Sequence, residues 1–125
     1  MDLGLKGRRA IVCASSKGLG RACATSLAQA GCEVFVNGRD AAGVAAAAGE
    51  IAAATGARVH GVAADVGTEQ GRAALLAACP APDILVNNNG GPPAKDFRAL
   101  SHADMVKGVE GNMITPIVLI QAVID

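Results

Sequence analysis

Aromatic residues are almost absent from this chain of 125 residues, which has two Phe and neither Trp nor Tyr. A mechanism that needs a phenol as its general acid therefore cannot be carried by these residues. An excess of charge of one sign is also missing, because 11 basic residues balance 11 acidic ones. No electrostatic argument then favours nucleic acid or an anionic membrane as a partner. We look instead for a site that binds a small molecule.

Long apolar runs and paired cysteines are missing as well. No apolar run is long enough to span a bilayer, and no apolar signal segment follows the basic start of the chain. The four cysteines, which show no C-x-x-C spacing, lie among Ala and Val. This setting favours small reduced core residues over a metal or redox site. We expect one domain over residues 1–125 of a cytoplasmic protein, with no metal ion and no membrane or nucleic-acid partner.

What the chain does have is a regular alternation of β-branched apolar runs with alanine-rich stretches. Strands are expected at residues 9–13, 33–39, 58–66 and 83–87, and helices at residues 19–30, 41–54, 68–78 and 101–125. Asp40 fits the N-cap of the second helix, and Ser101 with Asp104 fits a capping box. This order predicts an α/β fold with a doubly wound parallel sheet and helices on both faces.

The stretch CASSKGLG at residues 13–20 joins the first strand to the first helix. Gly18 and Gly20 let the backbone approach a pyrophosphate, and the helix start offers its N–H groups and dipole to negative charge. Ser15 and Ser16 add hydroxyl and backbone donors. Turns need glycine anyway, so the position within the first strand–helix–strand unit is what favours phosphate binding.

The second strand ends in Asn37-Gly38-Arg39, where a dinucleotide fold places the group that meets the adenosine ribose. A carboxylate there bonds the ribose hydroxyls and repels a 2′-phosphate, whereas Arg39 offers that phosphate a planar fork of donors. Lys17 adds a second positive charge on the same side. The pattern therefore favours NADP(H) over NAD(H), with solvated surface charges as the structural alternative.

Polar residues also follow the third and fourth strands. Asp65 and Val66 close the third strand, where a carboxylate accepts from an adenine amino group, although Asp is also a common turn former or N-cap there. The segment NNNGG at residues 87–91 ends the fourth strand. Open α/β sheets bind ligands beyond the carboxyl ends of their strands. Four polar strand ends on one edge therefore outline a site.

Pro116 lies inside the helical pattern at the end of the chain. It has no N–H, so the carbonyl of Asn112 is expected to lose its normal helix donor. Asn112 then presents an amide side chain and a free main-chain oxygen to a water or a neighbouring group. A kinked helix with a surface Asn is the alternative.

Taken together, CASSKGLGRA, NGR, DV, NNNG and the segment around Asn112 resemble the short-chain dehydrogenase/reductase family over essentially the whole chain. The family's glycine turn is usually T-G-x-x-x-G-x-G, and Cys13 and Ala14 stand at its first two places here. The family's N-N-A-G motif appears with Asn89 in place of Ala. The resemblance implies a Rossmann fold whose second half is incomplete in these residues.

The residues and the resemblance together assign a site. Asn112 is the catalytic candidate, because its main-chain oxygen would help to hold a water in the family's proton relay. Asn87 would brace the sheet. The residues assigned to NADP(H) are Ser15, Ser16, Lys17, Gly18, Leu19, Gly20, Asn37, Arg39, Asp65, Val66, Asn88, Asn89 and Gly90.

The family's other catalytic residues, a Ser and a Tyr-x-x-x-Lys, are not among these residues. The resemblance therefore implies that residues 1–125 are the NADP(H)-binding half of a longer oxidoreductase and are inactive alone. That enzyme would reduce a carbonyl to an alcohol, and the chain looks like bacterial 3-oxoacyl-acyl-carrier-protein reductases, whose substrate is a thioester. Family members are often dimers or tetramers, which implies self-association through Ile117, Ile120 and Ile124.

Two other functions remain open from the sequence. One is a catalytically inactive module that binds NADPH. The other is an interaction protein that uses the same shape without a cofactor and pairs with a second chain. Fold alone does not choose among the three.

Overall fold

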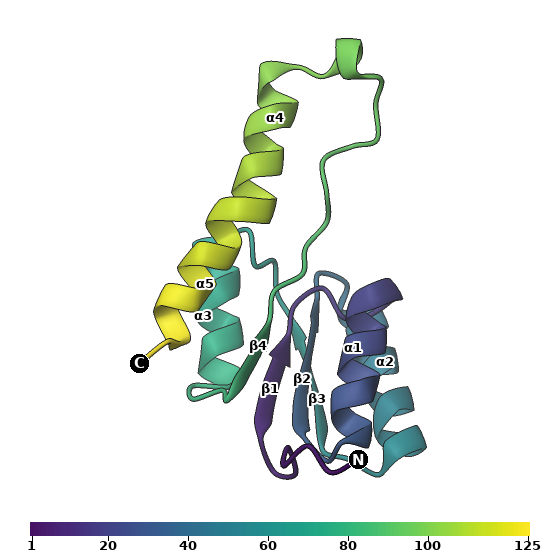
Figure 1. Cartoon of the computed structure of the whole chain (residues 1–125). Coiled ribbons are helices and arrows are strands. Elements are labelled where there is room, and N and C mark those ends of the chain that lie inside the picture. The colour runs from purple at the N-terminus through teal and green to yellow at the C-terminus, as the bar shows by residue number, and fades with distance from the viewer.

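Apolar β-branched runs build a parallel sheet, with helices on both of its faces in the computed structural model, which describes residues 1–125 (Figure 1). The strand order is β3-β2-β1-β4 and all neighbours are parallel. The strands are β1 (Arg9–Val12), β2 (Glu33–Gly38), β3 (Val59–Ala63) and β4 (Ile84–Val86). The helices are α1 (Gly18–Gln29), α2 (Ala41–Thr55), α3 (Glu69–Ala78), α4 (His102–Val109) and α5 (Thr115–Val123). This Rossmann-like sheet confirms the predicted fold class.

The pleat of β1 and β2 divides their side chains between two apolar layers. Val12 and Val36 face α1 and α2, where they pack with Ala24, Ala28, Val44 and Ala47. Ile11 and Phe35 face the other side and pack with Leu75 of α3 and Leu119 of α5. Figure 1 shows α1 and α2 on one face and α3 and α5 on the other. Both faces of the two central strands are therefore buried, as a parallel sheet requires.

Side-chain caps begin two helices where the sequence predicts them. Asp40 accepts from the Gly43 N–H at the start of α2, and Ser101 with Asp104 forms a full capping box at the start of α4. Hydrogen bonds from the Lys95 amino group and from Ser101 lower the pKa of Asp104 to about 2. Its carboxylate is therefore ionised across the ordinary pH range and holds the first turn of α4.

Two predicted elements differ from those observed. β3 ends at Ala63 and not at Val66. Val66 lies beyond the strand and packs in the core, with 3% of its surface exposed. The continuous helix predicted over residues 101–125 is divided, because a π-helical turn at Glu110–Ile114 (η2) separates α4 from α5. Pro116 explains the break, since it has no N–H to continue the hydrogen-bond ladder of an α-helix.

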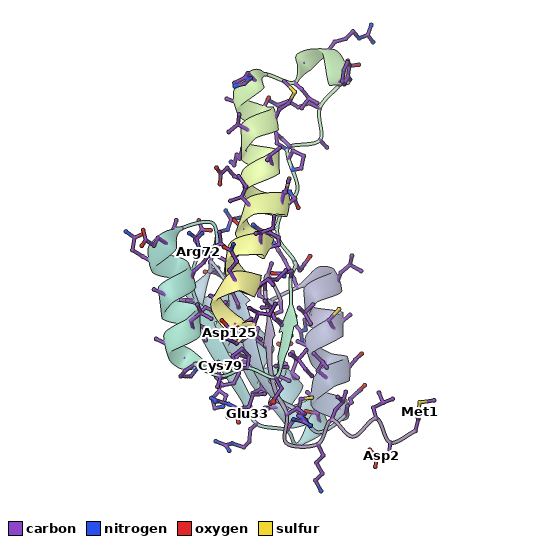
Figure 2. All side chains as sticks on the ribbon, turned by 60° about the vertical axis from the view of Figure 1, so that its left-hand side comes forward. Met1, Asp2, Glu33, Arg72, Cys79 and Asp125 are labelled. Atoms are coloured by element: carbon purple, nitrogen blue, oxygen red, sulfur yellow. The ribbon has the colours of Figure 1, made fainter.

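The end of the chain projects beyond the sheet. A long loop leaves β4, passes through a 3₁₀ turn at Phe97–Ala99 (η1) and returns through α4, which stands beyond the carboxyl ends of the strands (Figures 1 and 2). α5 then runs down along the face that carries α3 (Figure 1). None of the helices combines the length and the apolar character that crossing a bilayer requires.

The four cysteines carry free thiols, but they do not share one environment. Cys13, Cys32 and Cys79 are buried, as predicted for small core residues, whereas Cys23 is exposed on α1. Burial raises the pKa of Cys13 to about 11, so this thiol is not a reactive thiolate.

Candidate functional site

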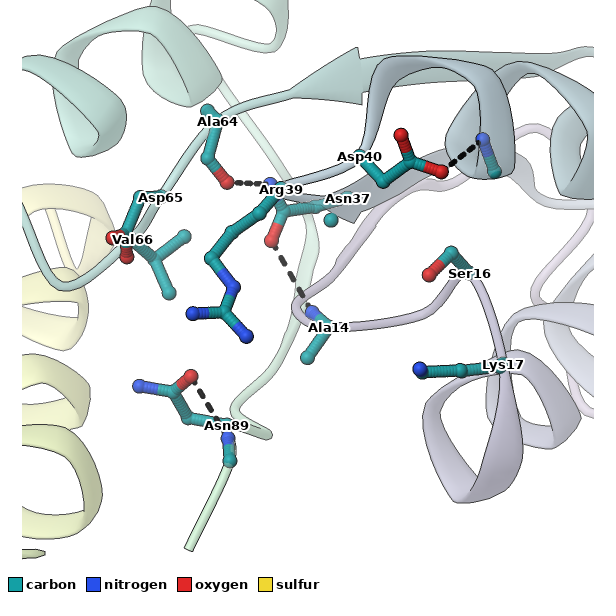
Figure 3. Close-up of a pocket in the computed structure, with 13 residues that line it drawn as sticks. Ala14, Ser16, Lys17, Asn37, Arg39, Asp40, Ala64, Asp65, Val66 and Asn89 are labelled. Carbon is teal, nitrogen blue, oxygen red and sulfur yellow. Dashed lines mark hydrogen bonds between the residues drawn. The ribbon is translucent and has the colours of Figure 1, made fainter.

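Two adjoining cavities lie at the carboxyl ends of the strands, and Figure 3 draws the residues that line the first of them. The first has a volume of about 390 Å³ and the second of about 370 Å³. Arg39, Asp65, Asn89 and Gly90 line both cavities. Also lining the first cavity are Ala14, Ser16, Lys17, Asn37, Gly38, Asp40, Gly43, Ala64 and Val66. The polar ends of all four strands thus meet in one place.

The turn between β1 and α1 is held in a tight shape by its small residues. Gly18 has a φ of +60° and Ala14 one of +44°, so both stand in the left-handed region. A Cβ added at Gly20 would collide with the Ala14 carbonyl and stand 2.8 Å from Asn88 Nδ2. The sequence assigns Gly20 to backbone contact with a pyrophosphate. The structure instead shows that glycine is needed here for close packing inside the protein.

Ser15 and Asn37 are buried and engaged within the protein. The Ser15 hydroxyl donates to the Val12 carbonyl at 2.6 Å and accepts from the Asn37 N–H at 2.9 Å. The Asn37 side chain accepts from the Ala14 N–H at 3.2 Å and donates to Val62 and Ala64 carbonyls at 3.2 and 3.0 Å. These bonds tie the glycine turn to the ends of β2 and β3. Although Asn37 lines the cavity, its polar side-chain atoms serve mainly to hold that shape.

The start of α1 adjoins the first cavity through Lys17, which lines it, and carries unused donors. Lys17 is the N-cap, its side chain makes no capping bond, and no acidic residue stands in the first turn. The first intrahelical donor is the Arg21 N–H, which reaches the Lys17 carbonyl at 3.3 Å. The N–H groups of Gly18, Leu19 and Gly20 therefore have no acceptor in the helix. Together with the helix dipole they favour an anion.

Arg39 and Lys17 add positive charge to the same cavity. Both line it, and neither forms an ion pair with a carboxylate. Figure 3 shows the Arg39 side chain reaching into the middle of the cavity from the end of β2. Asp40 lines the cavity too, but its carboxylate accepts from the Gly43 N–H at 2.9 Å. The local arrangement thus presents two cations without an ion-pair partner, and of the two carboxylates that line the cavity, Asp40 already caps a helix.

Asp65 and Val66 form one wall of the site. Asp65 lines both cavities, and one carboxylate oxygen accepts from the Gly67 N–H at 2.9 Å. This is the turn-forming role that the sequence left open. The second carboxylate oxygen makes no hydrogen bond within the protein. Asp65 therefore combines a turn with an acceptor that a ligand can use.

The loop after β4 forms the opposite wall. Asn88, which the sequence assigns to the cofactor, donates to the Ala14 carbonyl at 3.1 Å and so braces the glycine turn. Asn89 and Gly90 line both cavities. Asn112 lies in η2, where its amide donates to the carbonyls of Gly108 and Gly90 at 3.2 and 3.4 Å.

Several predicted residues do not line the two cavities. Ser15, Gly20 and Asn88 support the walls from behind, and Gly18 and Leu19 are exposed at the start of α1. Asn112 lies beside a separate apolar hollow of about 480 Å³ under the loop after β4.

Other residues that line the second cavity were missed. The last helical segment, which we define as residues 102–125 with α4, η2 and α5, contributes four of them. These are Lys107, Glu110, Gly111 and Thr115. Thr115 is 4% exposed and is one of only three buried polar or charged residues. A Thr directly before Pro116 in an apolar helix was the signal available in the sequence. Contact between the last helical segment and the sheet edge had to be known before that signal had a meaning.

Comparison with known proteins finds one family along almost the whole chain. The family model described as short chain dehydrogenase matches residues 8–125. The 3-oxoacyl-[acyl-carrier-protein] reductase FabG of Aquifex aeolicus is 32% identical over 117 residues, which cover 90% of this chain and 47% of that protein.

Solved structures agree with this match. The L-sorbose reductase of Gluconobacter frateurii, complexed with NADPH and L-sorbose, superposes with a TM-score of 0.91 at 27% identity and covers 99% of this chain and 49% of its own. A 7α-hydroxysteroid dehydrogenase complexed with NADH superposes with a TM-score of 0.85 at 31% identity, over 95% of this chain and 48% of its own. The chain therefore spans about half the length of the relatives it matches.

Proposed function

Because the chain belongs to the short-chain dehydrogenase family, we propose that residues 1–125 bind NADP(H) for an oxidoreductase that interconverts a carbonyl and an alcohol. Family membership makes this an oxidoreductase fold that uses a nicotinamide cofactor. The choice of NADP(H) over NAD(H) rests on one observation. Arg39 and Lys17, neither paired with a carboxylate, line a single cavity at the end of β2.

The residues present fit such a cofactor. Free N–H groups at the start of α1 suit its pyrophosphate, and Arg39 with Lys17 and Ser16 suits a 2′-phosphate. The unused oxygen of Asp65 suits an amino group of the base. Bound there, the nicotinamide would supply hydride chemistry that side chains lack. The protein's own part is to bind, to orient and to hold Asn112 near the loop after β4.

The substrate and the assembly are further parts of this proposal. The FabG relative supports a carbonyl substrate such as a 3-oxoacyl thioester. Three exposed isoleucines of the last helical segment support a homo-oligomer, a dimer or tetramer. The free thiols support a reducing compartment, the cytoplasm.

Proton transfer sets a limit on what these residues do alone. The sequence has no Tyr, so a phenol that protonates the carbonyl oxygen has to come from outside residues 1–125. We therefore propose that this chain binds NADP(H) and does not turn over a carbonyl by itself. A nucleotide-binding module without catalysis is the second candidate, and the same absence of Tyr favours it.

A binding experiment with Arg39 variants tests the cofactor assignment. The wild-type chain should bind NADPH roughly tenfold to a hundredfold more tightly than NADH, because hydrogen bonds between ionised groups contribute more than neutral ones. Arg39→Asp should lose most NADPH affinity and gain relative preference for NADH. Isothermal titration with both nucleotides measures the two dissociation constants.

Arg98→Asp is the matched control, because Arg98 lies on η1 and pairs with Asp96 away from the cavities. It should leave both dissociation constants unchanged. Equal losses for NADPH and NADH in Arg39→Asp would overturn the 2′-phosphate assignment. Wild-type protein that binds neither nucleotide would overturn the cofactor proposal as a whole.

A further inference from the structure

The π-helical turn η2 leaves one helix carbonyl without a main-chain donor. In an α-helix the Gly111 carbonyl would accept from the Thr115 N–H, four residues on. In η2 the Thr115 N–H donates to the Glu110 carbonyl instead, five residues back. The next residue, Pro116, has no N–H to offer at the wider spacing. The Gly111 carbonyl therefore needs a donor from elsewhere in the protein.

The side chain of Asn89 supplies that donor. Its Nδ2 donates to the Gly111 carbonyl at 3.1 Å, while its Oδ1 accepts from the Gly90 N–H at 2.9 Å. Both ends of the amide are thus engaged, one in the loop after β4 and one in η2. Alanine, which the resemblance gives for this place in the family motif, has no group that makes either bond.

A second side-chain amide, that of Asn112, forms a hydrogen bond from η2 back to the loop after β4. Asn112 Nδ2, beside Gly111 in η2, donates to the Gly90 carbonyl at 3.4 Å, next to Asn89 in the loop. The two segments lie close, since a Cβ on Gly111 would be 3.5 Å from Asn89 Nδ2. We name these two crossed bonds, Asn89 to Gly111 and Asn112 to Gly90, the amide clasp. It joins the wall of the cavities to the turn that carries Asn112.

We propose that Asn89 is a positioning residue, and that through the amide clasp it couples filling of the nucleotide cavities to the order of η2. This inference rests on the proposed function, because NADP(H) is the ligand that fills the cavities. Asn89 and Gly90 line both cavities. A nucleotide that packs on them restrains the loop, and the clasp passes that restraint to Gly111 and Asn112. Asn89 thereby fixes Asn112 without touching the reacting atoms.

Hydrogen exchange of the main-chain amides in η2 tests this coupling. In the wild-type chain, saturating NADPH should slow exchange at residues 110–115 about tenfold, as expected when a mobile turn gains the restraint of one or two hydrogen bonds. In Asn89→Ala, with NADPH raised until binding is saturated, the slowing at these residues should disappear, whereas the start of α1 should still be protected. Isothermal titration on the same samples confirms saturation.

Two further variants separate the clasp from general loss of structure. Asn89→Asp keeps an oxygen for the Gly90 N–H but has no donor for the Gly111 carbonyl, so it should behave like Asn89→Ala in η2. Ser101→Ala removes one capping bond of α4, about two turns before η2. It should speed exchange at the start of α4 and leave the NADPH effect at residues 110–115 intact.

The outcomes distinguish this inference from the proposed function. Binding of NADPH with no slowing in wild-type η2, or with the slowing retained in both Asn89 variants, would overturn the coupling and leave the cofactor proposal standing. Absence of NADPH binding to wild type would overturn both proposals. The amide clasp itself can still be tested without nucleotide. Main-chain amides at residues 110–115 should then exchange faster in Asn89→Asp than in the wild-type chain.

Discussion

At the scale of single residues, Ala14 is the most unusual position in the site. It is the only residue other than glycine with a positive φ, at +44°. In that region the Cβ of an L-residue crowds the following carbonyl, which costs roughly 1–2 kcal/mol. The strain is maintained by bonds on both sides, since the Ala14 N–H donates to Asn37 and its carbonyl accepts from Asn88.

Replacing Ala14 by glycine should therefore stabilise the chain. Relief of the strain exceeds the entropy that glycine adds to the unfolded state, so we expect the free energy of unfolding to rise by about 0.5–1 kcal/mol. Urea unfolding followed by circular dichroism measures the change. The control is Ala46→Gly on the exposed face of α2, where φ is helical and a loss of about 1 kcal/mol is expected. A destabilised Ala14→Gly would show that the alanine methyl makes a packing contact that outweighs the strain.

At the scale of elements, the division of the last helix is the feature that shapes the site. α4 and α5 run in continuation of each other, and the π-turn between them widens the helix where Pro116 follows (Figure 1). Single π-turns inside α-helices often occur at functional sites, because they free carbonyls and turn side chains outward. Here the freed carbonyl is on Gly111, which lies against Asn89 of the loop after β4.

Pro116→Ala tests whether proline maintains the π-turn. With an N–H at position 116, the bond to the Asn112 carbonyl can form and α4 can continue into α5 as one α-helix. We expect stronger helical circular dichroism, a protected amide at residue 116 and an increase of about 1 kcal/mol in the free energy of unfolding. In an intact enzyme, turnover should fall because Asn112 moves away from Gly90.

The loop residue Pro93 provides the control for this substitution, since it lies outside any helix. Pro93→Ala should leave the helical signal unchanged. An amide at residue 116 that exchanges as fast as in an unstructured peptide would show that the π-turn persists without proline. The cause would then lie in the clasp and in Thr115.

At the scale of the whole molecule, the apolar surface of the last helical segment has no cover within the chain. Ile117, Ile120 and Ile124 keep 44%, 42% and 71% of their surface exposed. Figure 2 shows α4 standing clear of the sheet above α5. Contiguous apolar surface of this kind commonly marks a protein interface.

We expect the wild-type chain to sediment as a species heavier than its 12.3 kDa monomer. Ile117→Asp combined with Ile120→Asp should shift it to the monomer, because a carboxylate on an apolar interface has no partner there. Analytical ultracentrifugation measures both masses. Phe97→Asp is the control, since Phe97 is 85% exposed on η1 and remote from α5. A wild-type chain that stays monomeric at the highest soluble concentration would contradict self-association.

The sequence by itself determined the local parts of this protein. Apolar β-branched runs specified the strands, and Asp40 and Ser101 specified the starts of two helices, because capping depends on residues three positions apart. Parallel strands bring their carboxyl ends to one edge, so the meeting of Lys17, Arg39 and Asn89 at one site followed from their positions after strands. Their roles toward NADP(H) stay predictions until binding is measured.

Only the tertiary structure decided which partner each site residue has. Gly20 must be glycine because Ala14 and Asn88 approach it from two other segments, and Asn89 meets a carbonyl 22 residues away that is free only because of a π-turn. The hydrogen-bonding groups of Asn37 are likewise engaged by two other segments, the turn after β1 and the end of β3. Contacts of this kind depend on the distance between segments after folding, which no local pattern of residues encodes. Propensity places elements, but packing decides which polar atoms remain free for a ligand.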